Sequence, residues 1–423
     1  METIVIIVFL LAYFGIILEH KLEINKTAFA LLGGALCWTA YILGSEEIHI
    51  VEENLFHSVS EIAGIVFFLL GAMTIVELID AHDGFDLVIE RIKTKSKKKL
   101  IIIMSLVCFF LSAILDNLTT TIVMITLMRK FNFSTIEKFF LCGIIVISAN
   151  AGGAWSPIGD VTTTMLWIGN QISASSIVIH TIIPSIVCAV VATILMLSKF
   201  KGEVSTVHSG PTNDTPESDK KIIFFAGVSS LIFVPIFKSI THLPPYMGML
   251  LSLSLLWFIS EMIHKDKDEF MRQELSINAA MKRIDTPSIL FFTGILLCIS
   301  SLQHIGTLTS LANRLSYIIP RMDVLTYCIG LVSAVIDNVP LVAASQGMYS
   351  LEVYPRDHEF WLNLAYTAGT GGSCLIIGSA AGVAAMGLEK INFMEYLKKI
   401  SWIAFLAYTA GALCFKVQAL LFY

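Results

Sequence analysis

Long apolar runs recur along the whole chain, separated by short polar segments. A helix needs about 20 apolar residues to cross the hydrocarbon core of a membrane, so each run predicts a membrane-spanning helix. We expect ten spans, near residues 2–18, 26–44, 61–80, 136–170, 173–199, 221–237, 244–263, 287–302, 359–388 and 395–420. The segment 201–220 is polar and rich in Ser, Thr and Pro, which predicts a linker between two sets of five spans.

Each set of five spans contains two irregular elements at the same places. A shorter apolar stretch with a polar centre follows the third span, at 100–128 and at 323–350. The fourth span of each set is long and interrupted by glycines. We interpret the short stretches as re-entrant hairpins and the glycine-rich spans as broken helices. The predicted fold is an all-α polytopic membrane protein.

Three sequence blocks recur in the same order and with nearly the same offset. They pair residues 112–118 (SAILDNL) with 333–339 (SAVIDNV), the glycines at 152, 153 and 159 with those at 371, 372 and 378, and residues 67–71 with 290–294. Internal similarity of this kind predicts a repeat architecture. We place the first repeat at 1–200, a cytoplasmic linker at 201–220 and the second repeat at 221–423.

The basic residues predict the orientation of the chain. With the N-terminus outside and each hairpin returning to its own side, 23 of the 28 Lys and Arg residues lie on the cytoplasmic side, as the positive-inside rule requires. Five crossings are an odd number, so the second repeat is inverted relative to the first. Both termini then lie outside, and the two hairpins enter from opposite faces. Inverted repeats with broken helices are typical of secondary transporters.

Composition excludes an ordinary soluble domain. The chain has 423 residues, of which 56% are hydrophobic and 14% are charged, and its mean hydropathy is +0.78. Membrane lipid is therefore an expected partner. The net charge of −5 is small, and we expect no nucleic-acid partner.

Few charged side chains lie at depth in the predicted spans. Asp116, Asp160 and Asp337 do, and we place no basic residue there. A charged side chain at the membrane centre costs about 3 kcal/mol or more, so each acid is a candidate functional residue. Asp116 and Asp337 each precede Asn, and either acid could instead simply cap the helix that follows it.

The interrupted span of the first repeat gathers side-chain oxygens between residues 148 and 163. In the second repeat Ser379 stands where Asp160 stands in the first, so the halves are not equivalent. The candidate residues for binding a cation or a proton are Asp116, Asn117, Ser148, Asn150, Asp160, Thr162, Thr163, Asp337, Asn338, Thr370 and Ser373. For Na⁺ itself the predicted ligands are Asp116, Asn117, Asn150, Asp160 and Asn338.

A set of oxygen ligands that includes carboxylates suits a hard cation. The same carboxylate can hold a proton instead, but not both at once. One site that alternates between Na⁺ and H⁺ is sufficient for exchange of the two ions. We expect no cofactor besides the transported Na⁺ or Li⁺ and H⁺.

Two further features receive structural interpretations. His82, His180 and His304 lie near predicted span ends, where an interfacial histidine without a special role is expected. A pH-sensing role is the alternative for them. The basic run 91–99 is interpreted as a topology anchor beside lipid headgroups.

The hairpin signatures LDNLTTT (Leu115–Thr121) and IDNVPL (Ile336–Leu341) resemble those of NhaD-type sodium/proton antiporters. The run SANAGGAWSPIGDVTTTMLW (Ser148–Trp167) is similar to the same family and is the most specific part. The resemblance covers nearly the whole chain in order. The family belongs to the ion transporter superfamily, which also holds arsenite permeases and sodium–dicarboxylate symporters.

This resemblance implies efflux of Na⁺ or Li⁺ driven by proton entry across a bacterial inner membrane, and hence a role in pH homeostasis. It also implies a scaffold domain, a mobile transport domain and a homodimer. The polar residues important in the family correspond here to Asp116, Asn117, Asn150, Asp160, Thr162, Thr163 and Asn338.

Two other functions remain as alternatives. An anion permease of the same superfamily, for arsenite or a dicarboxylate, could use the positive ends of half-helices, although three acids disfavour an anion. An intramembrane aspartyl protease would also need two buried acids. Residue 157 is Pro, so the G-x-G-D pattern expected of such a protease is absent before Asp160. We therefore expect a transporter and no enzyme activity.

Overall fold

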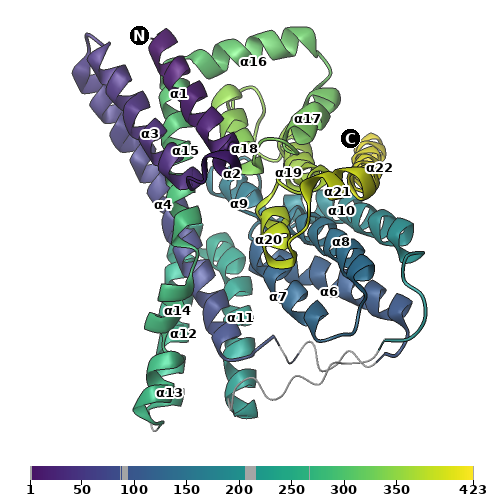
Figure 1. Ribbon diagram of the computed structural model, residues 1–423. Helices are drawn as coiled ribbons and strands as arrows, with labels where there is room; N and C mark the ends of the chain where they lie inside the picture. Colours follow the sequence, from purple (N-terminus) through teal and green to yellow (C-terminus); the bar gives the residue numbers. More distant parts are fainter. Residues whose placement is uncertain (1, 86, 88–93, 205–215, 266, 423) are drawn as a thin grey trace.

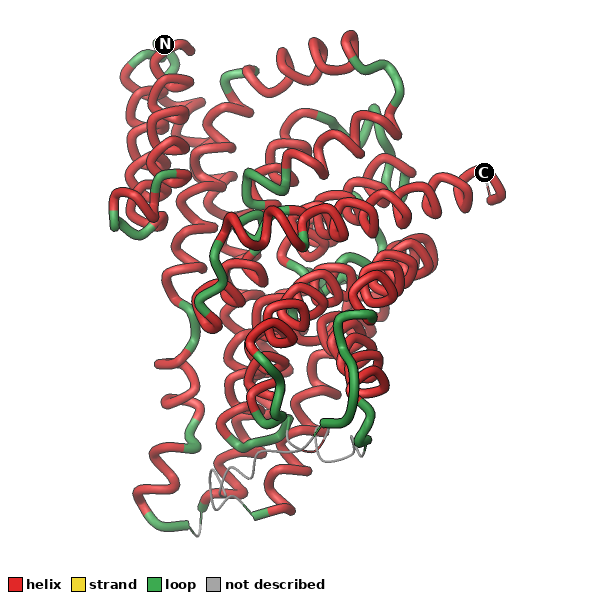
Figure 2. Tube along the Cα trace, turned by 45° about the vertical axis from the view of Figure 1, so that its right-hand side comes forward, coloured by secondary structure: helices red, strands yellow, loops and turns green. Residues whose placement is uncertain are grey.

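The computed structural model describes residues 2–85, 87, 94–204, 216–265 and 267–422 (Figure 1). Within these residues the regular structure is helical, apart from one isolated bridge between Ser96 and Glu203 (Figure 2). The all-α prediction is therefore confirmed. Most of the basic run 91–99 belongs to the described chain, but residues 91–93 do not, and the predicted linker lies outside it at 205–215.

The first half of the chain forms nine described helices. They are α1 (Glu2–Ile17), α2 (Glu19–Leu22), α3 (Lys26–Leu43), α4 (Ile48–Ala81), α6 (Lys97–Leu115), α7 (Asn117–Arg129), α8 (Thr135–Gly153), α9 (Val161–Ile168) and α10 (Ala174–Leu197).

The second half of the chain contains more short helices than the first. Its elements are α11 (Glu217–Thr241), α12 (Pro245–His264), α13 (Glu269–Glu274), α14 (Ile277–Arg283), α15 (Thr286–His304), α16 (Thr307–Ile318), α17 (Met322–Val332), α18 (Asn338–Met348), α19 (Glu359–Gly371), η1 (Gly372–Cys374), α20 (Ala380–Glu389), α21 (Phe393–Lys399) and α22 (Ser401–Phe422).

Among the described residues, nine helices are long and apolar enough to cross a membrane. The number is ten if α16 and α17, between which the chain bends by 119°, count as one span. The prediction of a polytopic membrane protein is confirmed. The boundaries differ in places. The helix α4 begins at Ile48 rather than near 61, because no Pro or Gly interrupts the polar stretch before Gly64. The last predicted span divides into α21 and α22.

The helices pack as two groups, which lie on the left and right of Figure 1. The long-helix group consists of α1, α3, α4, α11, α12 and α15, in which α3 packs on α15 and α4 on α12. The hairpin group consists of α6 to α10, α17 to α20 and α22, in which α6 packs on α8, α17 on α19 and α10 on α22. The groups touch through α15 with α18, α4 with α9 and α11 with α6.

The repeated sequence blocks make equivalent contacts in the hairpin group. Ser112 in α6 donates a hydrogen bond to the carbonyl of Ala149 in α8, with an O···O distance of 2.6 Å. Its sequence counterpart Ser333, beside α17, donates to the carbonyl of Ala368 in α19 at 3.0 Å. Each serine therefore ties the first arm of a hairpin to the backbone of the neighbouring broken helix.

Candidate functional site

Four helices of the hairpin group begin at a capping side chain. Asp116, Asp160, Asp337 and Ser379 are the N-caps of α7, α9, α18 and α20. Each accepts a hydrogen bond from a backbone N–H of the helix that it caps, at 2.8 to 3.3 Å. Both hairpin acids therefore cap the helices that follow them. Since a carboxylate has two oxygens, the backbone cap bond occupies only one oxygen of each acid.

Asp160 is the centre where the two hairpins meet. Its side chain is buried, with 2% exposure, and it lies between α8 and α9. Its Oδ2 atom accepts hydrogen bonds from the Nδ2 atoms of Asn117 at 2.9 Å and Asn338 at 3.2 Å. Asn117 opens α7 and Asn338 opens α18, so one carboxylate oxygen joins both hairpin tips.

The hydrogen-bond network continues through Asn150 in α8. Asn117 also directs Nδ2 to Oδ1 of Asn150, at 3.0 Å. Asn150 in turn donates to the hydroxyl oxygens of Ser373 and Ser379, both at 2.8 Å. These partners belong to the second broken helix. Predicted candidate residues from both hairpins and both broken helices therefore form one connected polar cluster, with Asp160 as its acid.

Asp116 lies beside this cluster and is bonded differently. Both of its carboxylate oxygens accept from Thr119, from the backbone N–H at 2.8 Å and from Oγ1 at 2.9 Å. Its backbone has φ 89° and ψ 162°, a conformation that residues other than Gly adopt at a cost of about 1–3 kcal/mol. Strain of this size is common at functional sites, and here it lets the chain reverse between α6 and α7.

The remaining predicted candidates have different surroundings. The hydroxyl of Thr163 bonds the backbone oxygen of Asp160 at 2.9 Å. The Oγ1 atom of Thr162 is buried and has no hydrogen-bond partner within the described chain. Ser148 instead bonds Ser105 at 2.9 Å, and Thr370 bonds the backbone of its own helix. Thr162 is thus the hydroxyl still available to a ligand.

Asp337 has a basic partner, contrary to the expectation that no basic residue lies at depth. The Nζ atom of Lys26, the first residue of α3, lies 3.3 Å from Oδ2 of Asp337. In the sequence Lys26 stands at the edge of an apolar run, which predicted a position on the cytoplasmic side of the membrane. Nothing in the local sequence indicates a partner 311 positions away.

A cavity of about 60 Å³ borders Asp116, Asn117 and Asp160. The long-helix group contributes the facing wall, which includes Phe68 and Phe292. The volume is enough for a small number of water molecules or a partly hydrated ion. The candidate cluster therefore opens onto the boundary between the two helix groups.

A second cavity of about 340 Å³ lies further along the same boundary. Its lining includes Ser58 and Glu61 from α4, Gln303 from α15 and Gln346 from α18. Compared with the smaller cavity, its lining residues lie nearer the N-terminus of α4 and nearer the C-terminus of α15. The smaller cavity thus lies at Asp160 itself, and the larger one lies to one side of it.

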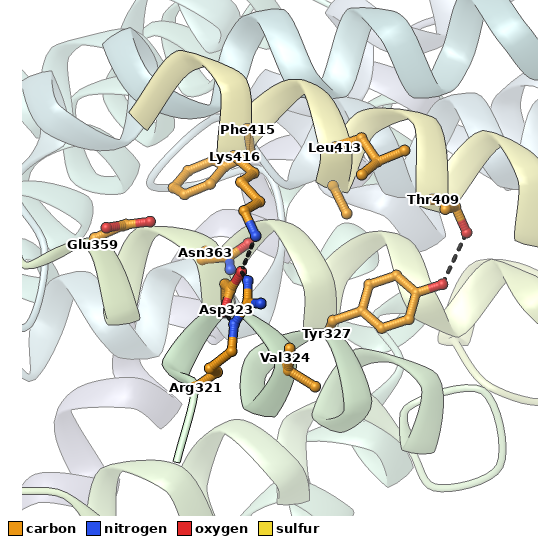
Figure 3. Close-up of a pocket in the computed structure, with 11 residues that line it drawn as sticks. Arg321, Asp323, Val324, Tyr327, Glu359, Asn363, Thr409, Leu413, Phe415 and Lys416 are labelled. Carbon is orange, nitrogen blue, oxygen red and sulfur yellow. Dashed lines mark hydrogen bonds and ion pairs between the residues drawn. The ribbon is translucent and has the colours of Figure 1, made fainter. Parts of the chain in front are cut away.

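A third cavity, of about 240 Å³, lies between α17, α19 and α22 (Figure 3). Three of its charged side chains bond one another, since Asp323 accepts from Arg321 at 2.7 Å and from Lys416 at 2.5 Å. Tyr327 and Thr409 also share a hydrogen bond across it, at 2.9 Å (Figure 3). No residue that lines this cavity belongs to the Asp160 cluster.

His82 is buried, contrary to the expectation of an interfacial histidine. Its Nδ1 lies 2.7 Å from the carbonyl oxygen of Leu78, and its Nε2 lies 3.1 Å from Nε2 of His264. Burial lowers the pKa of His82 to about 4. His82 is therefore neutral near pH 7 and packs between α4 and α12, which disfavours a pH-sensing role for it.

Comparison with known proteins identifies the class. Residues 9–357 match the model of a family described as citrate transporter. The chain is 48% identical to Sodium/proton antiporter 1 of Arabidopsis thaliana over 96% of its own length and 70% of that protein. It is 30% identical to the Na(+)/H(+) antiporter NhaD of Alkalimonas amylolytica, over 96% of this chain and 88% of the relative.

These matches define a membrane ion transporter rather than an enzyme, which removes the protease alternative. The chain belongs to the NhaD-type sodium/proton antiporter family of the ion transporter superfamily. The expected family resemblance is confirmed, and it extends along nearly the whole chain.

Proposed function

We propose that this protein exchanges cytoplasmic Na⁺ or Li⁺ for external H⁺ by competition of the two ions for Asp160. The observation that carries the proposal is the buried Asp160 carboxylate on which both hairpin tips converge. A buried charge without a counter-ion is costly, so this carboxylate favours either a bound cation or a bound proton. The names of the relatives, which are sodium/proton antiporters, support the same ions.

The neighbours of Asp160 suggest how a cation enters. Asn117 and Asn338 present N–H groups to this carboxylate. An amide that rotates presents its oxygen instead, and oxygen ligands suit Na⁺. The unpaired hydroxyl of Thr162 adds a further oxygen. Asp116 and Asn150 complete the predicted Na⁺ ligands from the sequence, with Asp116 beside the same small cavity.

We further propose the orientation inferred from the sequence. The two repeats are inverted, both hairpins are re-entrant, and both termini lie outside a bacterial inner membrane. With Lys26 at the second hairpin tip rather than on the cytoplasmic side, 22 of the 28 basic residues still lie on that side, which supports this arrangement. The larger cavity then lies nearer the outer side than the smaller one does. In this proposal the hairpin group moves against the long-helix group, which carries the contacts of a homodimer.

An anion permease is the second candidate, because the matching family is described as citrate transporter. Asp160, at the centre of the cluster, disfavours an anionic substrate. A buried carboxylate repels an anion, and Lys26, the basic residue near a hairpin tip, is already paired with Asp337. Within the described residues no unpaired cation borders Asp160, so a cation is the better substrate.

Everted membrane vesicles from cells without other antiporters test the proposal. Respiration acidifies the vesicle interior, and a pH-sensitive dye reports the gradient. We expect Na⁺ or Li⁺, but not a matched choline salt, to collapse that gradient. If neither ion does so at any pH from roughly 6 to 9.5, the range in which a perturbed carboxyl can titrate, the proposed exchange is wrong.

A further inference from the structure

The ammonium group of Lys26 is held in place by the long-helix group. Asn25 caps α3 by accepting from the N–H of Thr27 at 2.9 Å. The hydroxyl of Thr27 then bonds the carbonyl of Pro287 at the start of α15, also at 2.9 Å. From this anchored turn, the Nζ atom of Lys26 lies 4.3 Å from the centre of the Phe291 ring, a favourable cation–π distance. These contacts hold Lys26 in position independently of its ion pair with Asp337.

Both carboxylate oxygens of Asp337 are engaged by the protein itself. Oδ1 accepts from the backbone N–H of Val339, and Oδ2 faces Lys26 at 3.3 Å. The side chains of Lys26 and Asp337 are only 25% and 18% exposed. Neither charge would be stable there alone, because a largely buried ion without its partner loses its hydration uncompensated.

The three acids of the predicted site therefore differ in what faces them. Asp160 accepts hydrogen bonds from uncharged groups, and Asp116 is bonded to Thr119. Among the described ion pairs, Asp337 is the one of these three with a basic partner. A Na⁺ ion bound at Asp337 would lie within contact distance of an ammonium group, and like charges at that distance repel strongly.

We propose that Lys26 takes the place of a transported cation at Asp337, so that Asp337 binds no Na⁺ and Asp160 is the acid that exchanges ions. This inference rests on the proposed function and refines it, because it fixes how many acids bind a transported cation. The adjacent residues of the second hairpin tip then have separate tasks. Asn338 bonds the exchanging acid, while Asp337 is neutralised by Lys26.

The test is the number of ²²Na⁺ ions bound per purified chain at saturating Na⁺ and alkaline pH. Lys26→Gln removes the built-in cation and should raise the number by one relative to the unmodified protein. Lys26→Arg keeps the charge and should leave the number unchanged. The double variant Lys26→Gln/Asp337→Asn removes both charges and should also restore the original number.

Equal numbers for Lys26→Gln and Lys26→Arg, with both eluting as folded protein, would overturn the proposal. If Lys26→Gln does not fold, Asp337→Asn decides instead, since the proposal requires it to bind as many ions as the unmodified protein. A loss of one ion in Asp337→Asn would show that Asp337 is itself a ligand. Failure of the proposed function has a different signature, because the unmodified protein would then bind no Na⁺.

Discussion

Replacement of Asp160 by Asn should abolish the Na⁺- and Li⁺-dependent collapse of the pH gradient in everted vesicles. Asn has nearly the same shape as Asp but can neither balance the charge of a cation nor accept a transported proton. Loss of one partner from a buried charge pair costs about 3–5 kcal/mol, which corresponds to a loss of exchange on the order of 100-fold or more. The measurement is dye dequenching at saturating Na⁺, normalised to the amount of inserted protein.

A matched control separates the loss of this carboxylate from a general effect of the substitution. Asp323 is an acid of the same helix group, lies in the third cavity and is partly exposed between Arg321 and Lys416 (Figure 3). Since exposed ion pairs contribute about 1 kcal/mol or less, Asp323→Asn should keep exchange within roughly fivefold of the unmodified protein. Undiminished exchange by inserted Asp160→Asn protein would show that Asp160 serves only as the N-cap of α9.

Replacement of Gly152 by Ala should strongly destabilise the hairpin group. A methyl group built on Gly152 would lie 2.2 Å from the carbonyl oxygen of Phe109 in α6. Gly371 has the equivalent place in the second half, where a methyl group would lie 1.9 Å from the carbonyl oxygen of Gly330. A clash with backbone cannot be relieved by rotating a side chain, so we expect a destabilisation above roughly 3 kcal/mol.

Thermal unfolding in detergent, followed by fluorescence-detected size exclusion, measures this effect. Gly387→Ala is the matched control, because Gly387 lies in α20 and a methyl group there meets nothing within 4 Å. That change should be neutral or should stabilise by up to about 1 kcal/mol, the helix-propensity difference between Gly and Ala. A folded Gly152→Ala protein with unchanged thermal stability would mean that α6 and α8 are not packed this closely.

The helix breaks and their acids could be predicted from the sequence because each is locally unusual. Asp116, Asp160 and Asp337 interrupt long apolar runs, and glycines flank the break before Asp160. Polar groups at such places are costly, so their presence marks them as functional without any knowledge of the fold. The prediction that Ser379 replaces Asp160 agrees with the structure, where both residues cap the second half of a broken helix.

The contacts among these breaks could not be predicted, because they depend on how distant segments pack. Asn338 reaches Asp160 across 178 positions, and Lys26 reaches Asp337 across 311. Hydropathy also misplaced the start of α4, since it detects apolar runs and not the polar helical turns that precede them. Thus the acids could be identified from the sequence. Only the structure shows that Asp160 is bonded to uncharged donors whereas Asp337 is paired with a lysine.

The most direct test of exchange by competition is the apparent KM for Na⁺ measured at several pH values in the vesicle assay. If Na⁺ and H⁺ exclude each other at Asp160, the KM should rise by up to about tenfold for each unit that the pH falls below the effective pKa of the site, while the rate at saturating Na⁺ stays nearly constant. A KM that does not change with pH, together with a maximal rate that does, would show that the proton binds elsewhere and would contradict the mechanism.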